Sequence, residues 1–501
     1  MNEVQLLYVE NVISRKKKRL CQNVSFYIVL ENISHDKQCE VVWAGEDGHW
    51  QALSASYHSN LEPNKEYWTA HVSCVGSSVK SLPGNIVFAL RYQTLGCEYW
   101  DNNEGLNYSS QADSGVKVLT TEVIQNIGFE SQLLDDQNQI SVVVSVKQAI
   151  QVSAVTLHWS TDNWRHTHKT SCHFNRHYWD EETASNARNP NQYGSEIWQG
   201  KIKLDSAFSV QYLICCETAE QTYWDNNKGN NYSLRHKPLS ILMLNLHCYQ
   251  EDNQRFKFSQ IAKAINEQNA DIICLQEVAE LWNNGQGDWS TNAAKIINDQ
   301  LPQPFHLYTD WSHLGFDKYR EGVAILSRYP ILHQASKFVS NSHSPDNIHT
   351  RRVVMAQVNV PFLGLFNIYS VHLSWWDDGF SEQFTRLSQW ASDNQTNEVK
   401  GTLLCGDFNI TVGSEGYDLV VNNNNYEDPF LTFNSQGTAS KIFKVNDPYW
   451  QHSIAEDYRI DYLFMKKDSQ LKIIAANILF TDEDYGRVSD HCGYLMTFEA
   501  G

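Results

Sequence analysis

Eight polar residues in the second half of the chain stand at or near the ends of apolar segments, where such side chains can gather around a cation. Asn245 ends the run LSILMLN and Glu277 ends DIICLQE. Hard oxygen ligands of this kind suit Mg²⁺, which takes few protein carboxylates and keeps several waters. The others follow in the order His372, Asp407, Asn409, Asp461, Asp490 and His491. Each alone is most simply a helix cap or a loop hydrogen bond, but the whole set in this order is hard to explain in that way.

The segments around these residues predict the elements that position them. LSILMLNLHCYQ reads as a buried strand, FSQIAKAINEQNA as a helix with apolar positions three or four apart, and DIICLQEV as a second buried strand. This alternation continues to the end of the chain and predicts a layered α/β domain over residues 238–501. Gly406, just before Asp407, lets the backbone approach a ligand closely.

The order Asn, Glu, His, Gly-Asp-Phe-Asn, Asp, Ser-Asp-His resembles the endonuclease/exonuclease/phosphatase superfamily over nearly all of residues 238–501. Members of that superfamily cleave phosphodiesters or phosphomonoesters. The resemblance implies a deoxyribonuclease I-like fold, which is a four-layer α/β sandwich. It also implies Mg²⁺ as the cofactor, with Mn²⁺ as a substitute.

Residue roles follow from the same resemblance. The implied catalytic residues are His372, Asp407, Asn409, Asp461 and His491, and the implied metal ligands are Asn245, Glu277 and Asp490. Asn245 would bind directly or through water. Asp490 would be either a metal-site carboxylate or a partner of the residues around it. The general base stays open among the carboxylates.

The resemblance also assigns tasks within the catalytic set. Asp407 is expected to orient or deprotonate the attacking water, and Asn409 to hold the phosphate or that water. Asp461 should hydrogen-bond His491 and favour its charged form. Charged His491 and charged His372 would then neutralise the negative charge that develops during the reaction.

The charge balance bears on the substrate. Residues 238–501 hold 19 basic and 32 acidic side chains, a net charge of −13 out of −19 for the whole chain. Proteins that neutralise phosphate backbones usually carry a basic surface, so no nucleic-acid partner is expected. No stretch reaches 18 uninterrupted apolar residues and none is a basic amphipathic helix, so no membrane partner is expected either. A small phosphorylated sugar fits better.

Two further groups are candidates for holding that sugar phosphate. Trp375 and Trp376 lie in the segment SWWDDGF just after His372, where indole rings beside acidic residues suit stacking on a pyranose; either ring can instead pack the loop. Arg351 and Arg352 precede a predicted strand, and one of them can reach the phosphate, although a solvated rim is an equal alternative.

The first half of the chain contains a repeat. Residues 99–109 read YWDNNEGLNYS and residues 223–233 read YWDNNKGNNYS, which is nine identical positions of eleven at an offset of 124 residues. Short alternating strands broken by Gly, Asn and Asp turns predict two all-β sandwiches, over residues 1–118 and 119–237. Rings and Asn amides suit sugar recognition, whereas Asp-Asn-Asn-x-Gly is also turn chemistry.

The repeated string resembles the signature of carbohydrate-binding module family 21, over roughly residues 5–110 and 137–235. That resemblance implies a glucan or maltoside as a partner of these modules. The implied sugar-contact residues are Trp43, Trp50, Tyr99 and Trp100 in the first copy, and Trp159, Trp164, Tyr223 and Trp224 in the second. Either copy can instead be a packing domain.

The complete layout resembles the family of bacterial maltose 6′-phosphate phosphatases, which implies hydrolysis of maltose 6′-phosphate to maltose and phosphate.

The N-terminus has no apolar segment of the secretory type, and eleven cysteines without scaffold-like density suit a reducing cytoplasm. Two alternatives remain: a nuclease or other phosphodiesterase tethered to glycogen, and a glucan-binding targeting protein with an inactive hydrolase domain. The second alternative is disfavoured because all eight polar residues are present, whereas an inactive hydrolase domain is expected to have lost at least one of them.

Overall fold

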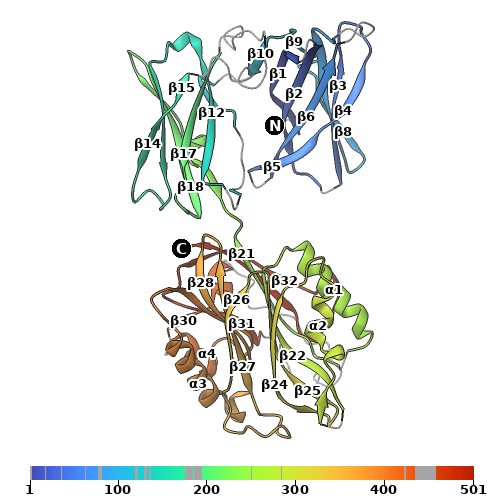
Figure 1. The fold of residues 1–501 in the computed structure, drawn as a ribbon, viewed down its shortest axis with the longest axis vertical. Coiled ribbons are helices and arrows are strands. Elements are labelled where there is room, and N and C mark those ends of the chain that lie inside the picture. The colour runs from blue at the N-terminus through green and yellow to red at the C-terminus, as the bar shows by residue number, and fades with distance from the viewer. Residues whose placement is uncertain are drawn as a thin grey trace. The chain divides into compact units, whose positions relative to one another are not determined.

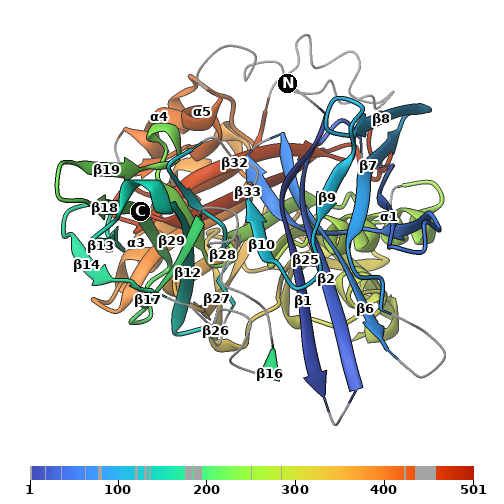
Figure 2. The same cartoon turned by 90° about the horizontal axis from the view of Figure 1, so that it is seen from above.

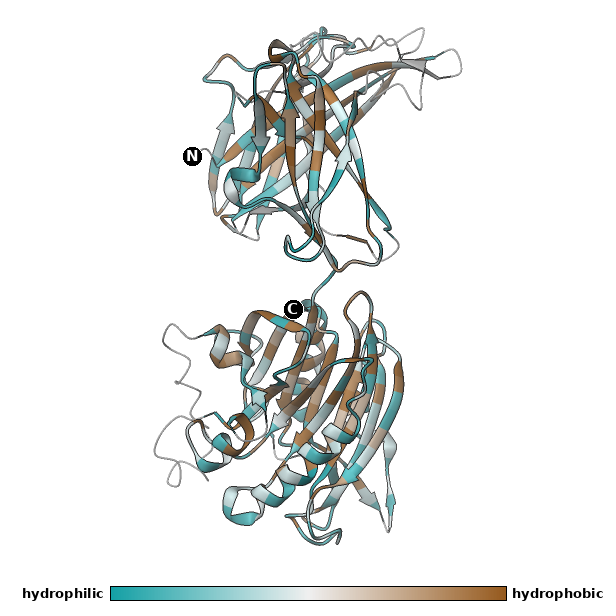
Figure 3. Cartoon of the chain, turned by 90° about the vertical axis from the view of Figure 1, so that its left-hand side faces the viewer, coloured by the Kyte–Doolittle hydropathy of each residue, from teal (hydrophilic) through white to brown (hydrophobic). Residues whose placement is uncertain are grey.

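The computed structural model of the protein consists mostly of β-strands and forms two compact units, Met1–Lys237 and Pro238–Gly501. The structure describes residues 3–16, 19–34, 36–62, 64–76, 82–118, 122–128, 133–134, 137–174, 184–185, 195–249, 251–283, 285–422, 425–434 and 459–501. In Figure 3, hydrophobic and hydrophilic residues alternate along many of the strands, as expected where one face of a sheet packs on a core.

The first unit begins with two sheets that face each other. One has the order β10-β1-β2-β6-β5, with β16 also pairing β1, and the other has the order β4-β3-β7-β8, with β9 also pairing β7. Their strands are β1 (Val4–Lys16), β2 (Arg19–Glu31), β3 (Lys37–Ala44), β4 (Gln51–Ser54), β5 (Ser56–Glu62), β6 (Lys65–Val75), β7 (Ile86–Thr94), β8 (Cys97–Asp101), β9 (Tyr108–Ser110), β10 (Gly115–Val118) and β16 (Ala184–Ser185). β1 and β2 form a long antiparallel ribbon (Figure 2). Phe26 and Phe88, one from each sheet, meet edge to face in the core between them.

Two more sheets of the first unit enclose a second core. Their orders are β11-β12-β17-β15 and β14-β13-β18-β19, with β20 also pairing β18. Their strands are β11 (Ile124–Asn126), β12 (Gln139–Lys147), β13 (Ala154–Ser160), β14 (His168–Ser171), β15 (His173–Phe174), β17 (Ser195–Lys203), β18 (Ser209–Glu217), β19 (Thr222–Asp225) and β20 (Tyr232–Arg235). The pairings between the described strands of the first unit are antiparallel, so tight turns can connect those neighbours that are also consecutive in the chain, such as β1 and β2.

A small apolar cluster joins these two halves of the first unit. Tyr8 and Val12 of β1 pack against Ile127 and Val143, and the Tyr8 hydroxyl donates a hydrogen bond of 2.9 Å to the carbonyl oxygen of Ile127. Because side chains two residues apart share a face of a strand, Glu10 points the same way as Tyr8 and Val12. Burial raises the pKa of Glu10 from 4.5 to about 7, and a hydrogen bond from the Tyr27 side chain offsets part of that shift.

Replacing Glu10 is therefore expected to change stability in a pH-dependent way. Since the folded state binds the Glu10 proton more tightly than the unfolded state, stability falls as pH rises from about 4.5 to about 7. Glu10→Gln removes this loss and should stabilise the protein by about 3 kcal/mol at pH 8, with almost no gain at pH 4.5. Thermal unfolding at both pH values measures the difference, with the exposed Glu220→Gln as the control. An equal gain at both values would contradict the assignment.

The second unit contains two mixed sheets. One has the order β24-β25-β22-β21-β33-β32, with β23 also pairing β22, and the other has the order β26-β27-β28-β29-β31-β30. The strands of the first are β21 (Leu239–Asn245), β22 (Ile272–Asn283), β23 (Gln286–Gly287), β24 (His306–Gly315), β25 (Tyr319–Ser327), β32 (Leu471–Leu479) and β33 (Gly493–Ala500). The strands of the second are β26 (Ile331–Phe338), β27 (Arg352–Val360), β28 (Gly364–His372), β29 (Val399–Asp407), β30 (Tyr426–Glu427) and β31 (Asp461–Lys466).

Helices cover the outer faces of this unit. In Figure 1, α1 (Gln254–Glu267) and α2 (Ala293–Asn298) lie on one side of the strands, and α3 (Phe380–Asp393) and α4 (Glu415–Val421) lie on the other. A further short helix is α5 (Pro429–Phe433). Phe258, Ile261 and Ile265 of α1, spaced three and four residues apart, are buried against the first sheet. Among the described helices, none is both long and apolar enough to cross a membrane.

Each sheet of the second unit contains one parallel strand pair with a helical crossover. α1 connects β21 to β22, and α3 connects β28 to β29, as a parallel connection requires. Asn245 lies opposite Gln276 in the first pair, and His372 lies opposite Asp407 in the second. The carboxyl ends of both pairs therefore carry the polar residues singled out in the sequence.

Candidate active site

Asn245 connects the two sheets at these strand ends. Its Nδ2 donates to Glu277 Oε1 at 2.9 Å and to Asp407 Oδ2 at 3.0 Å, while its Oδ1 accepts from the backbone N–H of His247 at 3.1 Å. The His247 N–H thus fixes which way the amide faces. A direct bond from Asn245 to a cation would have to share Oδ1 with that N–H, so its main role in this geometry is to hold two carboxylates together.

Asp407 is the most buried carboxylate of the predicted set that faces this centre. Burial raises the pKa of Asp407 to about 7, and the charges of Asp461 and Glu277 add to the rise. The backbone N–H of Asn409 donates to Asp407 Oδ1 at 2.9 Å. Gly406 has φ of +145°, and a Cβ there would lie 2.1 Å from the carbonyl oxygen of Val371, so only glycine fits.

His491 forms a pair with Asp461, as the sequence predicts. Nδ1 of His491 lies 2.7 Å from Asp461 Oδ2, and Nε2 lies 3.9 Å from Asp407 Oδ2. Burial lowers the pKa of His491, but Asp461, Asp490 and Asp407 outweigh it, so the pKa lies well above its usual value. His491 is therefore held as an imidazolium whose Nε2 faces the centre of the site.

His372 differs from the expectation that it is charged. It is buried, and its Nε2 lies 3.7 Å from Asp407 Oδ2. Burial lowers its pKa well below the usual value, and the nearby positive charges of Arg351 and His491 add to the effect. The ring is therefore neutral and can accept a hydrogen bond or bind a metal, but it does not supply the positive charge that the sequence suggested.

The two candidate arginines have different surroundings. Arg351 is close enough to Glu277, Asp407 and Glu321 for their charges to act on its pKa, while burial lowers that pKa overall. Arg352 instead pairs with Asp310 and lies over the ring of Phe338, with its guanidinium carbon 3.8 Å from the ring centroid. The structure thus brings Arg351 to the site and directs Arg352 to a neighbouring ion pair.

The two tryptophans after His372 lie on a segment attached to the site. The backbone N–H of Leu373 donates to the carbonyl oxygen of Asp407 at 3.0 Å, and Asn409 Nδ2 donates to the carbonyl oxygen of Leu373 at 2.9 Å. Trp375 and Trp376 follow, and are 38% and 39% exposed. Both rings are thus partly exposed on a segment whose first residue is hydrogen-bonded to Asp407 and Asn409.

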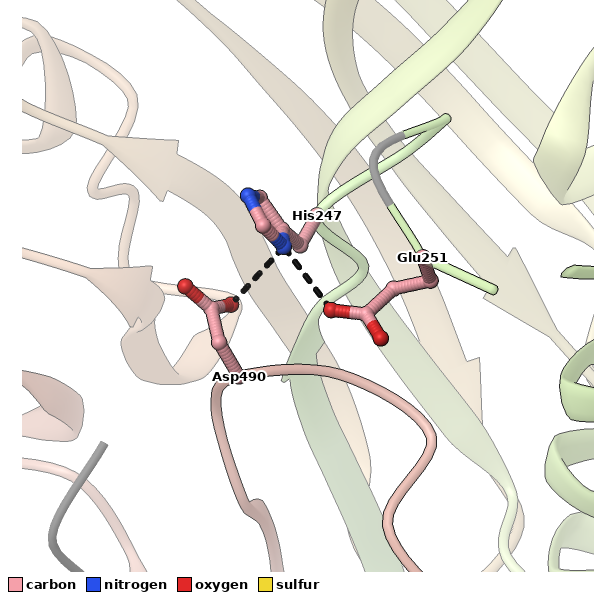
Figure 4. A group of neighbouring side chains, drawn as sticks. All are labelled: His247, Glu251 and Asp490. Carbon is pink, nitrogen blue, oxygen red and sulfur yellow. Dashed lines mark hydrogen bonds and ion pairs between the residues drawn. The ribbon is translucent and has the colours of Figure 1, made fainter. Parts of the chain in front are cut away.

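Sequence reasoning missed a second group of polar side chains, shown in Figure 4. His247 Nδ1 lies 2.8 Å from Glu251 Oε1 and 3.5 Å from Asp490 Oδ1. Although burial lowers the pKa of His247, the carboxylates around it raise the pKa overall. Its position two residues after Asn245, with a carboxylate four residues later, was the available signal. The structure places Asp490 in this group.

Glu321 is a further residue that the sequence did not single out. Burial raises its pKa to about 8, the charge of Glu277 adds to the rise, and Arg351 opposes it. His313 Nε2 lies 3.5 Å from Glu321 Oε1. A carboxylate just before the apolar run VAIL of β25 was the signal for it.

The donor set fits a divalent cation. Ligand atoms of Glu277, His372 and Asp407 all lie within 4.8 Å of one another, and the same holds for the group around His247 and for Asp407 with Asp461 and His491. Within the described residues, the buried Asp461 Oδ1 has no hydrogen-bond partner. Carboxylate oxygens suit Mg²⁺ or Mn²⁺, whereas imidazole nitrogen suits transition metals better, and the crowding of buried carboxylates favours a bound positive charge.

The repeated segments of the first unit close their turns with their own polar side chains. The Tyr108 hydroxyl donates to Asp101 at 2.7 Å, and Asn102 Oδ1 accepts from the backbone N–H of Gly105 at 2.9 Å. The second copy repeats both bonds, from Tyr232 to Asp225 and from Gly229 to Asn226. These Asp and Asn side chains are engaged within the loop, which favours the turn interpretation for them.

The aromatic candidates of the modules divide by exposure. Trp43 is 2% exposed and packs in the core of its sandwich, so it is not available for stacking, contrary to the expectation. The half-buried Tyr99, Trp159 and Tyr223 pack against their cores, and Trp164 is half-buried. The exposed members of the set are Trp50, Trp100 and Trp224. Arg91 lies over Trp100 at 5.8 Å, whereas His158 meets Trp224 at 5.0 Å, so the two copies offer different surroundings.

Comparisons with known proteins support two of the family resemblances. Residues 244–491 match the Endonuclease/Exonuclease/phosphatase family, and residues 123–235 match the Carbohydrate/starch-binding module (family 21). The uncharacterized protein YbhP of Escherichia coli (strain K12) is 29% identical over 179 residues, which is 34% of this chain and 66% of that protein. The chain thus spans just under two thirds of the length of this relative.

Solved structures are similar to the same half of the chain. An endonuclease/exonuclease/phosphatase family protein from Leptotrichia buccalis C-1013-b is 23% identical, with a TM-score of 0.44, and the match covers 52% of this chain and 99% of that one. A mannosyl-6-phosphatase from Bacteroides thetaiotaomicron VPI-5482 is 16% identical, with a TM-score of 0.37 and the same coverage of both chains.

Proposed function

We propose that the domain with the endonuclease/exonuclease/phosphatase match is a divalent-metal-dependent phosphomonoesterase whose substrate is a phosphorylated sugar, namely maltose 6′-phosphate. One observation carries the proposal: two exposed tryptophans follow His372 on a segment that is hydrogen-bonded to Asp407 and Asn409. A phosphate held at the carboxylates would leave its sugar within reach of those rings, and indole faces stack on the apolar faces of pyranoses.

The roles proposed for the site residues follow from their chemistry. Glu277 and Asp490 would hold Mg²⁺, or Mn²⁺ in its place, with Asn245 positioning Glu277. The bound cation would polarise the phosphoryl oxygens and stabilise the leaving alkoxide. Asn409 would hold the phosphate or the attacking water beside Asp407.

The proton transfers would involve three side chains. Asp407, whose pKa is raised to about 7, would accept a proton from water near neutral pH. His491, kept protonated by Asp461, would donate hydrogen bonds to the phosphoryl oxygens as negative charge develops on them. Arg351 would provide the second positive charge, in place of the neutral His372.

The proposal also covers the domains of the chain, the sugar contacts of its modules and its location in the cell. Residues 1–118 and 119–237 would be carbohydrate-module-like sandwiches that bind a glucan or maltoside, and residues 238–501 would be a four-layer α/β sandwich of deoxyribonuclease I-like fold. Trp50, Trp100 and Trp224 are the proposed sugar contacts because they are exposed. All eleven cysteines are free thiols, which supports a cytoplasmic location.

A substrate panel tests the proposal. The full chain with Mg²⁺ should release free phosphate from maltose 6′-phosphate faster than from glucose 6-phosphate, because the disaccharide offers a second ring to the tryptophans. It should not nick plasmid DNA, since the acidic domain repels a polyanion. Trp375→Ala with Trp376→Ala should raise KM for the sugar phosphate while leaving turnover of a small aryl phosphate unchanged.

The outcomes separate the alternatives. Plasmid nicking without phosphate release would replace the proposal with a nuclease or other phosphodiesterase. No turnover of any phosphoester, together with retained glucan binding, would favour a non-catalytic targeting protein.

A further inference from the structure

A recess in the second unit lies apart from the carboxylate cluster. It is formed by β22, β24, β25 and the short turn η4 (Trp289–Thr291), and has a volume of about 230 Å³, open to solvent. Ligand pockets generally measure about 300–1,000 Å³ and combine aromatic walls with a few polar groups. The recess is smaller than this range, so it suits a single ring of a ligand, and it combines two tryptophans with polar groups.

The recess faces away from the catalytic carboxylates. Glu280 pairs with Arg320 between β22 and β25, and Ala279 pairs with Glu321 in the next register position. Since neighbouring residues of a strand point to opposite faces, Glu280 and Arg320 lie on one face and Glu321 lies on the other. The charge of Glu277 raises the pKa of Glu321, so these two side chains are on the same side of the strands. The catalytic cluster, which includes Glu277, therefore lies on the face of Glu321. The recess is therefore a separate site behind the same strands.

The charged groups of the recess are already paired. Glu280 is 2% exposed, lies 2.5 Å from Arg320 Nη2, and accepts a hydrogen bond of 2.9 Å from Asn292 Nδ2. Asp310 is paired with Arg352. No charged side chain of the recess is left uncompensated, so the site favours a neutral ligand with hydroxyl groups over a phosphate or a carboxylate.

The aromatic walls are suited to a sugar ring. Trp289 is 45% exposed, and Trp311 is half-buried, with Trp282 at 5.6 Å and the Arg320 guanidinium at 5.9 Å. These contacts fix the orientation of Trp311 but leave Trp289 available at the opening. Indole faces contact the C–H groups of a pyranose, and Thr309 Oγ1, which donates to the carbonyl oxygen of Val323 at 2.9 Å, can accept a hydrogen bond from one of its hydroxyls.

The backbone of β23 lies directly on the paired charges. A Cβ at Gly287 would lie 2.1 Å from Glu280 Oε1 and 2.4 Å from Arg320 Nε. A side chain at this position would thus displace the Glu280–Arg320 pair. Because residue 287 is a glycine, β23 can pack directly on the Glu280–Arg320 pair.

From these observations we propose that the recess binds a neutral pyranose unit of a gluco-oligosaccharide. It is a carbohydrate site within the hydrolase unit, additional to the family 21 module. The proposal does not depend on the proposed function, because it concerns binding on the other face of the sheet.

Hydrogen exchange of the full chain with maltotriose tests the proposal. Maltotriose at up to about 10 mM should protect the backbone amides of residues 285–292 and 309–311. Trp289→Ala should abolish that protection, whereas Trp289→Phe, which keeps a ring, should retain part of it. Trp224→Ala, which removes another exposed tryptophan in the first unit, is the matched control and should leave the protection unchanged.

Three results would overturn the proposal. The first is unchanged exchange of residues 285–292 in the parent protein at the highest maltotriose concentration. The second is full protection in Trp289→Ala. The third is stronger protection by adenosine monophosphate than by maltotriose, which would identify a nucleotide site. A melting temperature of Trp289→Ala equal to that of the parent protein would show that loss of protection reflects the recess and not unfolding.

Discussion

Asp407→Asn is expected to lower kcat for phosphate release by about 10³-fold, the usual scale for losing a general base. The amide keeps the size of the side chain and can still accept the hydrogen bond from the Asn409 N–H, but it cannot take a proton from water. The melting temperature should not fall. The charges of Asp461 and Glu277 raise the pKa of Asp407, so a neutral side chain there relieves repulsion.

Phosphate release under saturating substrate and thermal unfolding of the same sample check this expectation. The matched control is Asp482→Asn, because Asp482 is an exposed carboxylate whose partner is Arg487. It should leave both kcat and the melting temperature unchanged. Asp407→Asn with the parent kcat would show that Asp407 is not the base, and the carboxylates around it would then need to be tested individually.

Removal of divalent metal is expected to abolish turnover, and added Mg²⁺ to restore it. A cation at a phosphoryl group contributes several kcal/mol of transition-state stabilisation, so the loss should exceed about 10³-fold. Glu277→Gln removes a carboxylate that Asn245 holds in place, and should therefore raise the Mg²⁺ concentration needed for half-maximal activity at least about 10-fold.

Glu251→Gln tells the two candidate cation groups apart. If Glu277 is the main ligand of the cation, Glu251→Gln changes the Mg²⁺ requirement less than Glu277→Gln does, because Glu251 belongs to the group around His247. If the Mg²⁺ requirement shifts with Glu251→Gln and not with Glu277→Gln, the assignment of Glu277 is wrong and the cation belongs to the group in Figure 4. Turnover that persists in excess chelator would contradict metal dependence altogether.

The positions of the site residues could be predicted because strand ends are visible in the sequence. Asn245 and Glu277 interrupt apolar runs, and the carboxyl ends of parallel strands meet at one edge of a sheet. The position of Asp407 could be predicted in the same way, because Asp407 ends an apolar strand. It lies opposite His372 because β28 and β29 are paired. The match of residues 244–491 supports the family that this order of residues suggested.

The charge states and orientations of these residues could not be predicted from the sequence. His372 is neutral because burial and the nearby Arg351 act together, and neither is visible in its neighbours along the chain. Arg352 is adjacent to Arg351 in sequence, yet its partner is Asp310, which comes from a different sheet. Both features depend on contacts between segments that are far apart in sequence.

Trp43 shows a signal that the sequence analysis overlooked. Cys39, Val41 and Trp43 alternate along β3, and all three are buried. Period-2 alternation therefore predicted that Trp43 faces the core together with Val41. In β8 the same alternation separates Tyr99, which packs on the core, from Trp100, which is exposed.

The position of β33 has a consequence for synthesis on the ribosome. β21, the first strand of the second unit, pairs with β33, so Leu239 lies opposite Phe498 in the sheet. Until β33 has emerged, one edge of β21 has no neighbour, and an unpaired strand edge is open to aggregation. Asn245 lies on that same strand. We therefore expect a nascent chain that lacks β33 to need protection by chaperones, and to acquire activity only after the last strand has been released.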